Sequence, residues 1–217
     1  MSTITTNTPA IVEAYHRLGW YLVPLALNTK SPNRWSWSRK ENCIGPGQAF
    51  PPDSSIGIAL AYSGLCSIDV DNVGLARTWL AERGVDLDAY FSSNEMVQIT
   101  SGVANHVKLL LRMPASHPVL PCYAHTDNKK HVIQFRNGTR TDSTVQDVAP
   151  FSILPDTGLP YQWIGDYTQI PEPPAVWLTV WLTGLESTER AEHSDGIETS
   201  EAEFEAALAT LDADMQR

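Results

Sequence analysis

Short apolar runs of strand length dominate the sequence and most constrain its fold. Runs of this kind cover residues 20–25, 56–61, 65–70, 96–100, 106–113 and 131–135, and further short strands are expected within 145–163. Helical spacing of apolar residues is confined to residues 8–18, 72–84 and 171–184. Because the strands outnumber the helices and do not alternate with them, the pattern predicts an α+β fold rather than a βαβ series.

Composition limits the classes of protein to which the chain can belong. Apolar residues make up 42% of the 217 residues, which predicts a packed core. The sequence has no run of about 18 apolar residues and no secretory signal pattern, so we expect no membrane contact. The three cysteines lie far apart and form no Cys-x-x-Cys pair. A reducing cytoplasm is therefore expected, that of the host if a phage encodes the protein.

The net charge of −10 is distributed unevenly along the chain. Residues 186–217 hold ten acids and two bases, which leaves 15 acids and 13 bases in residues 1–185. We therefore expect one domain over 1–185 and an acidic, partly helical tail over 186–217 that leads to a further region. The near-neutral charge of the domain neither requires nor excludes a nucleic-acid partner.

Two aspartates, Asp69 and Asp71, interrupt the apolar run LCSIDVDN. Side chains two apart on a strand point the same way, so the two carboxylates lie side by side. A helix begins directly afterwards with Asn72 as its cap, which puts the pair at the end of a strand. Two interpretations remain open: a site for divalent metal ions, or a polar strand end that turns into a helix.

A second group of polar residues follows the strand at 96–100. His106 and Lys108 alternate along one strand and so share a face, and a turn containing Ser101 precedes them. A histidine, a lysine and free backbone donors suit a triphosphate. The alternative is a hairpin with a solvated lysine.

Residues 131–163 contribute further candidates. Gln134 and Arg136 share a strand face, Asp147 is an acid within a strand-like run, and Ser152 lies in a turn after a proline. These residues suit either phosphate binding or an ordinary hairpin with a structural arginine.

A long irregular segment, residues 28–55, carries the last candidates. Lys30 lies near its start and is either a functional or a solvated lysine. Trp35 and Trp37 in the same segment either stack on bases or anchor the segment.

The ordered set of motifs resembles a known family. The motifs are, in chain order, GWYLVPLALNTKSPNRW, SIDVDN, TSGVANHVKLLLRMP, VIQFRNGT and VQDVAPFSILPDTGLPYQW. Together they resemble the N-terminal primase-polymerase domain of the archaeo-eukaryotic primase superfamily, which phage and plasmid replication proteins carry. The resemblance covers about residues 10–180. It implies a two-part fold, with a small N-terminal α/β module beside an RRM-like antiparallel sheet and the active-site cleft between them.

The resemblance also implies roles for individual residues. Asp69 and Asp71 would bind two Mg²⁺ or Mn²⁺ ions, and His106 would act with them as a catalytic residue. The nucleotide-binding residues would be Lys30, Ser101, His106, Lys108, Arg136 and Ser152. Where the family usually has a third acid, this chain has Gln134, so either Asp147 or Gln134 itself is the candidate third metal ligand.

The resemblance leads to one main hypothesis for function and two alternatives. The main hypothesis is a DNA primase-polymerase that transfers dNTPs or NTPs on a DNA template and primer, with a helicase region elsewhere in the full protein. The first alternative, motivated by Gln134, is a replication-initiation or DNA-binding module with weakened catalysis. The second is a metal-dependent nuclease, since paired carboxylates also serve phosphodiester hydrolysis.

Overall fold

The computed structural model describes residues 8–93, 96–153 and 158–189. The chain divides into two compact units, Met1–Leu178 and Thr179–Arg217, and the sheets belong to the first. The predicted domain boundary at residue 185 stays a prediction, and the helix predicted within 200–215 lies outside the described residues. Within the described ranges, no helix is long and apolar enough to cross a membrane.

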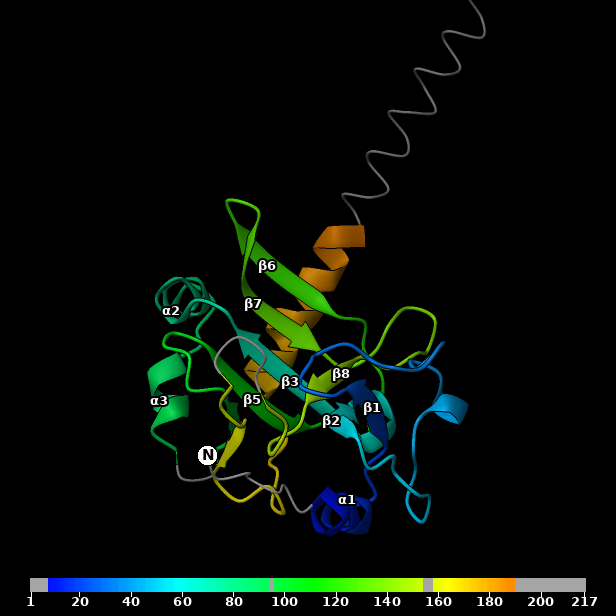
Figure 1. Cartoon of the computed structure of the whole chain (residues 1–217). Coiled ribbons are helices and arrows are strands. Elements are labelled where there is room, and N and C mark those ends of the chain that lie inside the picture. The colour runs from blue at the N-terminus through cyan, green and yellow to red at the C-terminus, as the bar shows by residue number, and fades with distance from the viewer. Residues whose placement is uncertain (1–7, 94–95, 154–157, 190–217) are drawn as a thin grey trace, which may run out of the picture. The chain divides into compact units, whose positions relative to one another are not determined.

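A three-stranded antiparallel sheet forms one layer of the first unit. It consists of β1 (Leu22–Ala26), β2 (Ser54–Ala59) and β8 (Gln146–Val148), in the order β1-β2-β8. The third strand comes from late in the chain, and Figure 1 shows it, in yellow-green, near the blue and cyan strands. The smaller sheet is therefore not built from the N-terminal segment alone.

A six-stranded antiparallel sheet forms the larger part of the unit. Its strands are β3 (Leu65–Val70), β4 (Val97–Thr100), β5 (Val107–Arg112), β6 (Tyr123–Asp127), β7 (Lys130–Arg136) and β9 (Gln162–Ile164). Their order is β6-β7-β3-β5-β4-β9, so β3 lies in the interior between β7 and β5 (Figure 1). Both neighbours run antiparallel to β3.

Helices precede, connect and follow the strands. They are α1 (Thr8–Arg17), η1 (Lys40–Asn42), η2 (Ala61–Ser63), α2 (Val73–Ala81), α3 (Leu87–Phe91) and a helix over 175–189. The Asn72 side chain accepts a hydrogen bond from the Leu75 N–H and so caps α2, as predicted. Asp86 caps α3 in the same way, through the N–H groups of Asp88 and Ala89.

The main core lies between the two sheets. Its buried members are Val12, Tyr15, Trp20, Leu22, Ile44, Ile56, Ile58, Leu60, Leu65, Val97, Ile99, Leu110, Ala149 and Ile170. Burial of apolar side chains from both sheets holds them together, at about 25 cal/mol per Å² of apolar surface removed from water. An aromatic group made of Tyr15, Trp20, Trp163 and Tyr167 packs within this core, with ring centroids 5.1–6.3 Å apart.

The structure confirms the mixed α+β class with antiparallel sheets and corrects several elements. The strand predicted at 65–70 has those limits. The sequence pattern missed α3 and β6, because five residues are too few to show a clear periodicity. The helix predicted from 171 begins at 175, because Pro171, Pro173 and Pro174 disfavour helical backbone at the residues before them.

Candidate active site

The candidate site begins at the C-terminal end of β3. Leu65, Ser67 and Asp69 alternate along one face of this strand, which changes from apolar to charged along its length. In the sheet register, Asp69 lies opposite Lys108 on β5 and opposite Gln134 on β7. Directly opposed residues have side chains on the same face, so three polar side chains meet in one row across three strands.

Asp71 lies just past the end of β3. Its backbone N–H and that of Asn72 both donate to the Val132 carbonyl, at 3.0 and 3.3 Å. The capped start of α2 follows at once. The turn is therefore fixed on both sides, and it keeps Asp71 beside Asp69 on the wall of one cavity.

Lys108 lies between two carboxylates. Its Nζ is 3.0 Å from Asp69 Oδ2 and 2.8 Å from Asp147 Oδ1. Burial opposes the charge on Lys108, but Asp147 and Asp69 outweigh that effect and raise the pKa of the lysine. Lys108 is therefore a fixed cation of the site rather than a solvated lysine.

Asp147 is the most buried charged group of the site. It lies on β8, opposite Ile58 of β2, and is 1% exposed. Its Oδ1 accepts hydrogen bonds from Lys108 Nζ and from Arg136 Nε, the latter at 3.1 Å. Burial alone would raise the pKa of Asp147, but Lys108 and then Arg136 lower it to about 2. Because Lys108 and Arg136 belong to the six-stranded sheet, Asp147 joins the two sheets through charge.

Arg136, on β7, reaches across to the smaller sheet and bonds two neighbouring residues of β8. Its Nη2 donates to the Gln146 carbonyl at 3.0 Å, in addition to its bond with Asp147. The Asp147 carboxylate is the main cause of the raised pKa of this guanidinium. A planar guanidinium that bonds a carboxylate and a backbone carbonyl of β8 fixes the position of that strand relative to β7 in the other sheet.

Gln134 is oriented as a donor toward Asp71. Its Nε2 donates to Asp71 Oδ2 at 2.9 Å, and Arg136 Nη1 lies 3.5 Å from its Oε1. Turning the amide over would bring its N–H groups toward the guanidinium, which is itself a donor. The neighbours therefore direct the amide oxygen away from Asp71 and toward Arg136.

His106 and Ser101 lie at the open side of the site. His106 Nδ1 is 3.7 Å from Asp71 Oδ1, and about half of the imidazole is exposed. Ser101 follows β4 in a turn that Gly102 makes with a φ of 75°. Both residues line the same cavity as the two aspartates. An exposed imidazole and a turn with backbone donors are available to a ligand that enters from solvent.

These side chains surround a cavity of about 270 Å³ between the two sheets. Its lining residues are Lys30, Asp69, Asp71, Ile99, Ser101, His106, Val107, Lys108, Arg136, Gln146, Asp147, Val148 and Tyr161. Eight of the ten predicted site residues are in this lining, whereas Gln134 only borders it through Asp71. Ile99, Gln146 and Tyr161 were not predicted, although Tyr161 lies in the PDTGLPYQW motif.

Ser152 is not brought to the cavity. It is 4% exposed, and its Oγ accepts a hydrogen bond from the Ile56 N–H at 2.9 Å. The same hydroxyl donates to the Ile56 carbonyl at 3.3 Å. Ser152 therefore pairs with the backbone of β2, and the predicted contact with a nucleotide has no support from its position.

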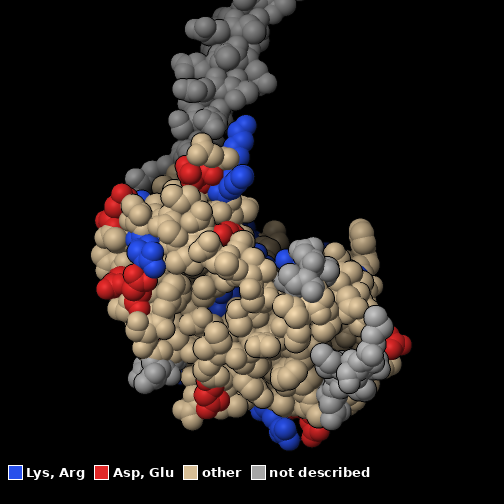
Figure 2. All heavy atoms as spheres, turned by 60° about the vertical axis from the view of Figure 1, so that its left-hand side comes forward, with Lys and Arg blue, Asp and Glu red and all other residues tan. Residues whose placement is uncertain are grey.

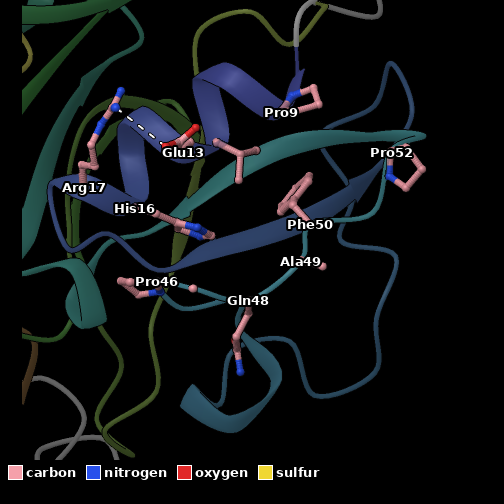
Figure 3. Close-up of a pocket in the computed structure, with 11 residues that line it drawn as sticks. Pro9, Glu13, His16, Arg17, Pro46, Gln48, Ala49, Phe50 and Pro52 are labelled. Atoms are coloured by element: carbon pink, nitrogen blue, oxygen red, sulfur yellow. Dashed lines mark ion pairs between the residues drawn. The ribbon is translucent and has the colours of Figure 1, made fainter.

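A larger hollow of about 750 Å³ lies between α1 and residues 46–52 (Figure 3). Figure 3 shows His16 and Phe50 pointing into it, with the ion pair of Glu13 and Arg17 at one side. Its lining is mostly apolar and includes several prolines. It lacks the paired carboxylates and fixed cations of the smaller cavity, so the residues of the smaller cavity suit phosphate chemistry better.

The donor set fits a divalent metal ion that takes some of its ligands from the protein and the others from a bound substrate. Asp69 and Asp71 present carboxylate oxygens on one wall, and Mg²⁺ is commonly held by one or two carboxylates plus substrate phosphates. Among the described residues, no group of three or more His, Cys, Asp or Glu side chains could hold a metal by itself. The residues therefore suit an ion completed by phosphate oxygens rather than an all-protein cage.

One face of the molecule carries dispersed charges. Figure 2 shows one face on which Lys, Arg, Asp and Glu side chains are interspersed and separated by wide uncharged areas. That face presents no broad basic surface to a polyanion.

Paired carboxylates at the end of a central strand, close to fixed cations, suit phosphoryl or nucleotidyl transfer. The chain belongs to the family of bifunctional DNA primase/polymerase N-terminal domains (Prim-Pol), whose family model matches residues 12–176. This confirms the resemblance inferred from the motifs, and it makes the protein a DNA primase/polymerase, a nucleotidyltransferase of DNA replication. No curated protein matches the sequence.

Proposed function

We propose that the cavity between the two sheets carries out nucleotidyl transfer from dNTPs or NTPs onto a primer, or onto a first nucleotide, paired with a DNA template. The observation that supports this most is that two carboxylates, Asp69 and Asp71, and two cations, Lys108 and Arg136, line the same cavity. Carboxylates suit a divalent ion, and cations suit phosphates, so both parts of a metal-bound triphosphate have partners.

We assign the acidic wall to metal binding. Asp69 and Asp71 would hold two Mg²⁺ or Mn²⁺ ions together with the phosphates of the nucleotide. When bound, such ions lower the pKa of the attacking hydroxyl and stabilise the negative charge of the pyrophosphate that leaves. Gln134 keeps Asp71 in place through its N–H donor rather than serving as a ligand. Phosphate oxygens of the nucleotide would complete the ligand set of the ions.

We assign the basic and open sides of the cavity to the triphosphate. His106, Lys30 and the turn at Ser101 would contact its oxygens, because each lines the cavity and has donors to offer. Lys108 already bonds Asp69 and Asp147, so it supplies a cation at a fixed position. Asp147 is a positioning residue in this proposal, since its Oδ1 holds both Lys108 and Arg136.

The test is primer extension with Mg²⁺ or Mn²⁺. Wild type should incorporate nucleotides, while Asp69→Asn and Asp71→Asn should each lose at least 100-fold in rate, about 2.7 kcal/mol of transition-state stabilisation. Asp53→Asn, at an exposed acid, is the matched control. Wild type that incorporates nothing with either metal would overturn the polymerase proposal.

The donor role of Gln134 supports a second candidate, a DNA-binding module with weakened catalysis. A neutral amide adds no negative charge next to Asp71, so the acidic wall attracts a cation less than three acids would. Binding of primer-template DNA without incorporation would favour this candidate. A metal-dependent nuclease is distinguished by degradation of the DNA when no dNTP is added.

We further propose that the protein works in phage or plasmid replication, in the cytoplasm, as the N-terminal part of a larger protein with a helicase region. The description of the family as an N-terminal domain supports the multidomain part of this proposal. The likeness of the six-stranded sheet to an RRM and the position of the active-site cleft between two modules also remain proposals. Co-purification of a helicase activity with the full-length protein would test the arrangement.

A further inference from the structure

The segment that follows β1, residues 27–42, carries two tryptophans, one exposed and one partly buried. Trp35 is 91% exposed. Trp37 is partly buried and packs against a cluster made of Val23, Leu25, Cys43, Ala59 and Val148. Trp37 therefore anchors the segment, whereas Trp35 leaves most of its large aromatic surface in water, and core packing does not account for it.

Hydrogen bonds fix the backbone of the segment on both sides of Trp35. The Asn42 side chain donates to the Ser36 carbonyl at 3.1 Å, and Arg34 Nη1 donates to the Asn42 carbonyl at 3.2 Å. The Ser38 carbonyl accepts from the Thr144 N–H at 3.0 Å, which ties the segment to the residues before β8. Ser36 has a φ of 50°, a left-handed conformation that turns the chain between the two tryptophans. An exposed indole on a fixed support is suited to stacking.

The charge of the segment is opposite to that of the chain. Residues 27–42 contain four exposed bases, Lys30, Arg34, Arg39 and Lys40, and one acid, Glu41, for a net charge of +3 in a chain of −10. A ligand that combines negative charge with flat aromatic faces matches this arrangement. Single-stranded nucleic acid has both properties, and its bases are free to stack because they are not paired.

The segment also reaches the candidate active site. Lys30 lines the cavity, and the Gln146 side chain donates to the Lys30 carbonyl at 3.1 Å. Figure 1 shows this blue segment leaving β1 and running near β8. A strand that enters the cavity past Lys30 would therefore meet Arg34 and Trp35 within five residues of the same segment.

We propose that Trp35, with Arg34, Arg39 and Lys40, binds the single-stranded part of the DNA template outside the cavity, with a base stacked on the indole. That the strand is a template rests on the proposed function. Binding itself does not require catalysis, so the two proposals fail in different ways.

The test measures binding of a fluorescein-labelled DNA strand of roughly 20 nucleotides by fluorescence anisotropy. Trp35→Ala should weaken the affinity for the single strand about tenfold, and Trp35→Phe should keep most of it, since stacking needs an aromatic ring. Both variants should bind a blunt duplex of the same sequence with the affinity of wild type, because the bases of a duplex are paired and cannot stack on the indole. Leu75→Ala, at another exposed apolar side chain, is the matched control.

The salt dependence separates the roles of ring and charge. The double variant Arg39→Ala and Lys40→Ala should reduce the slope of log affinity against log salt by about 1.4, at roughly 0.7 for each phosphate contact to a single strand. Trp35→Ala should leave that slope unchanged.

Three results would overturn the proposal: single-strand binding by Trp35→Ala equal to that of wild type, an equal loss for single strand and duplex, or no single-strand binding by wild type. If the variants lose single-strand affinity as expected but wild type incorporates no nucleotide, the proposed function alone is overturned. Thermal unfolding of each variant, followed by circular dichroism, checks that its fold is intact.

Discussion

Lys108 on β5 and Asp147 on β8 connect the two sheets through a contact of 2.8 Å between Nζ and Oδ1. Asp147 is almost fully buried, and Arg136 reaches the same oxygen from β7. The two cations and the carboxylate thus fix the spacing of the sheets at the cavity, while the pairing of β3 with β5 places Lys108 beside Asp69. The same group of charges therefore serves both the stability of the fold and the geometry of the site.

Replacing Asp147 should destabilise the protein strongly. Asp147→Asn leaves Lys108 and Arg136 partly buried without their shared anion, and losing one partner of a buried pair costs roughly 3–5 kcal/mol. Urea unfolding followed by circular dichroism measures the free energy of unfolding. Asp53→Asn, at an exposed acid, should change it little. Equal unfolding midpoints for the two variants would contradict this role of Asp147.

Stability should fall in acid because of the same carboxylate. The pKa of Asp147 is lowered from 3.8 to about 2 in the folded protein, so its contribution is present above 3.8 and is lost as the pH falls through about 2. Urea unfolding of wild type between about pH 5 and pH 2 should show this loss. Asp147→Asn should show a shallower decline over the same range, and parallel curves for the two proteins would refute the assignment.

A carboxylate at position 134 should tighten metal binding. Gln134 now donates to Asp71, and Gln134→Asp adds a negative charge near it, which should strengthen Mn²⁺ binding at least tenfold, about 1.4 kcal/mol. Electron paramagnetic resonance of free Mn²⁺ measures the affinity without any assay of activity. Gln162→Asp, on an exposed position of β9, should leave the affinity unchanged. An unchanged affinity in Gln134→Asp would place the ion away from Asp71.

Gly57 makes room for Gln146 beside the cavity. A Cβ at position 57 would lie 2.6 Å from Gln146 Oε1 and 3.2 Å from Leu25 Cδ2. Gly57→Ala should therefore displace the flexible end of the Gln146 side chain from Lys30 and cost about 1 kcal/mol through overpacking. In the double variant with Gln146→Ala, much of that cost should be recovered, because the clashing side chain is gone. Strict additivity of the two changes in urea unfolding would show that the clash is not the cause.

The hydroxyl of Tyr15 should matter to the core although its ring packs on every side. It accepts a hydrogen bond from Trp163 Nε1 at 3.1 Å and donates to the Pro150 carbonyl at 3.4 Å. Tyr15→Phe leaves the indole N–H and the carbonyl without this partner and should cost roughly 1–3 kcal/mol in unfolding free energy. Tyr167→Phe, in the same aromatic group, is the control and should cost less.

Local pattern was enough to predict several parts of the site. Alternation along a strand put Asp69 with Asp71, His106 with Lys108, and Gln134 with Arg136, because side-chain direction on a strand depends only on residue spacing. The Asn72 cap and the start of α2 are local in the same sense, and both are confirmed. The order of the motifs then indicated the family, which the family model confirms over residues 12–176.

The sequence by itself thus determined which side chains share a face within each strand and which family the chain resembles. The tertiary structure alone decided which strands are neighbours, and so which of those faces meet: β3 pairs with β5 and β7, and β8 brings Asp147 from the other sheet. It also decided that Ser152 bonds the backbone of β2 and that Trp35, unlike Trp37, stays exposed. Contacts between distant segments, and the burial that shifts a pKa, depend on packing of the whole core, which no spacing along one strand contains.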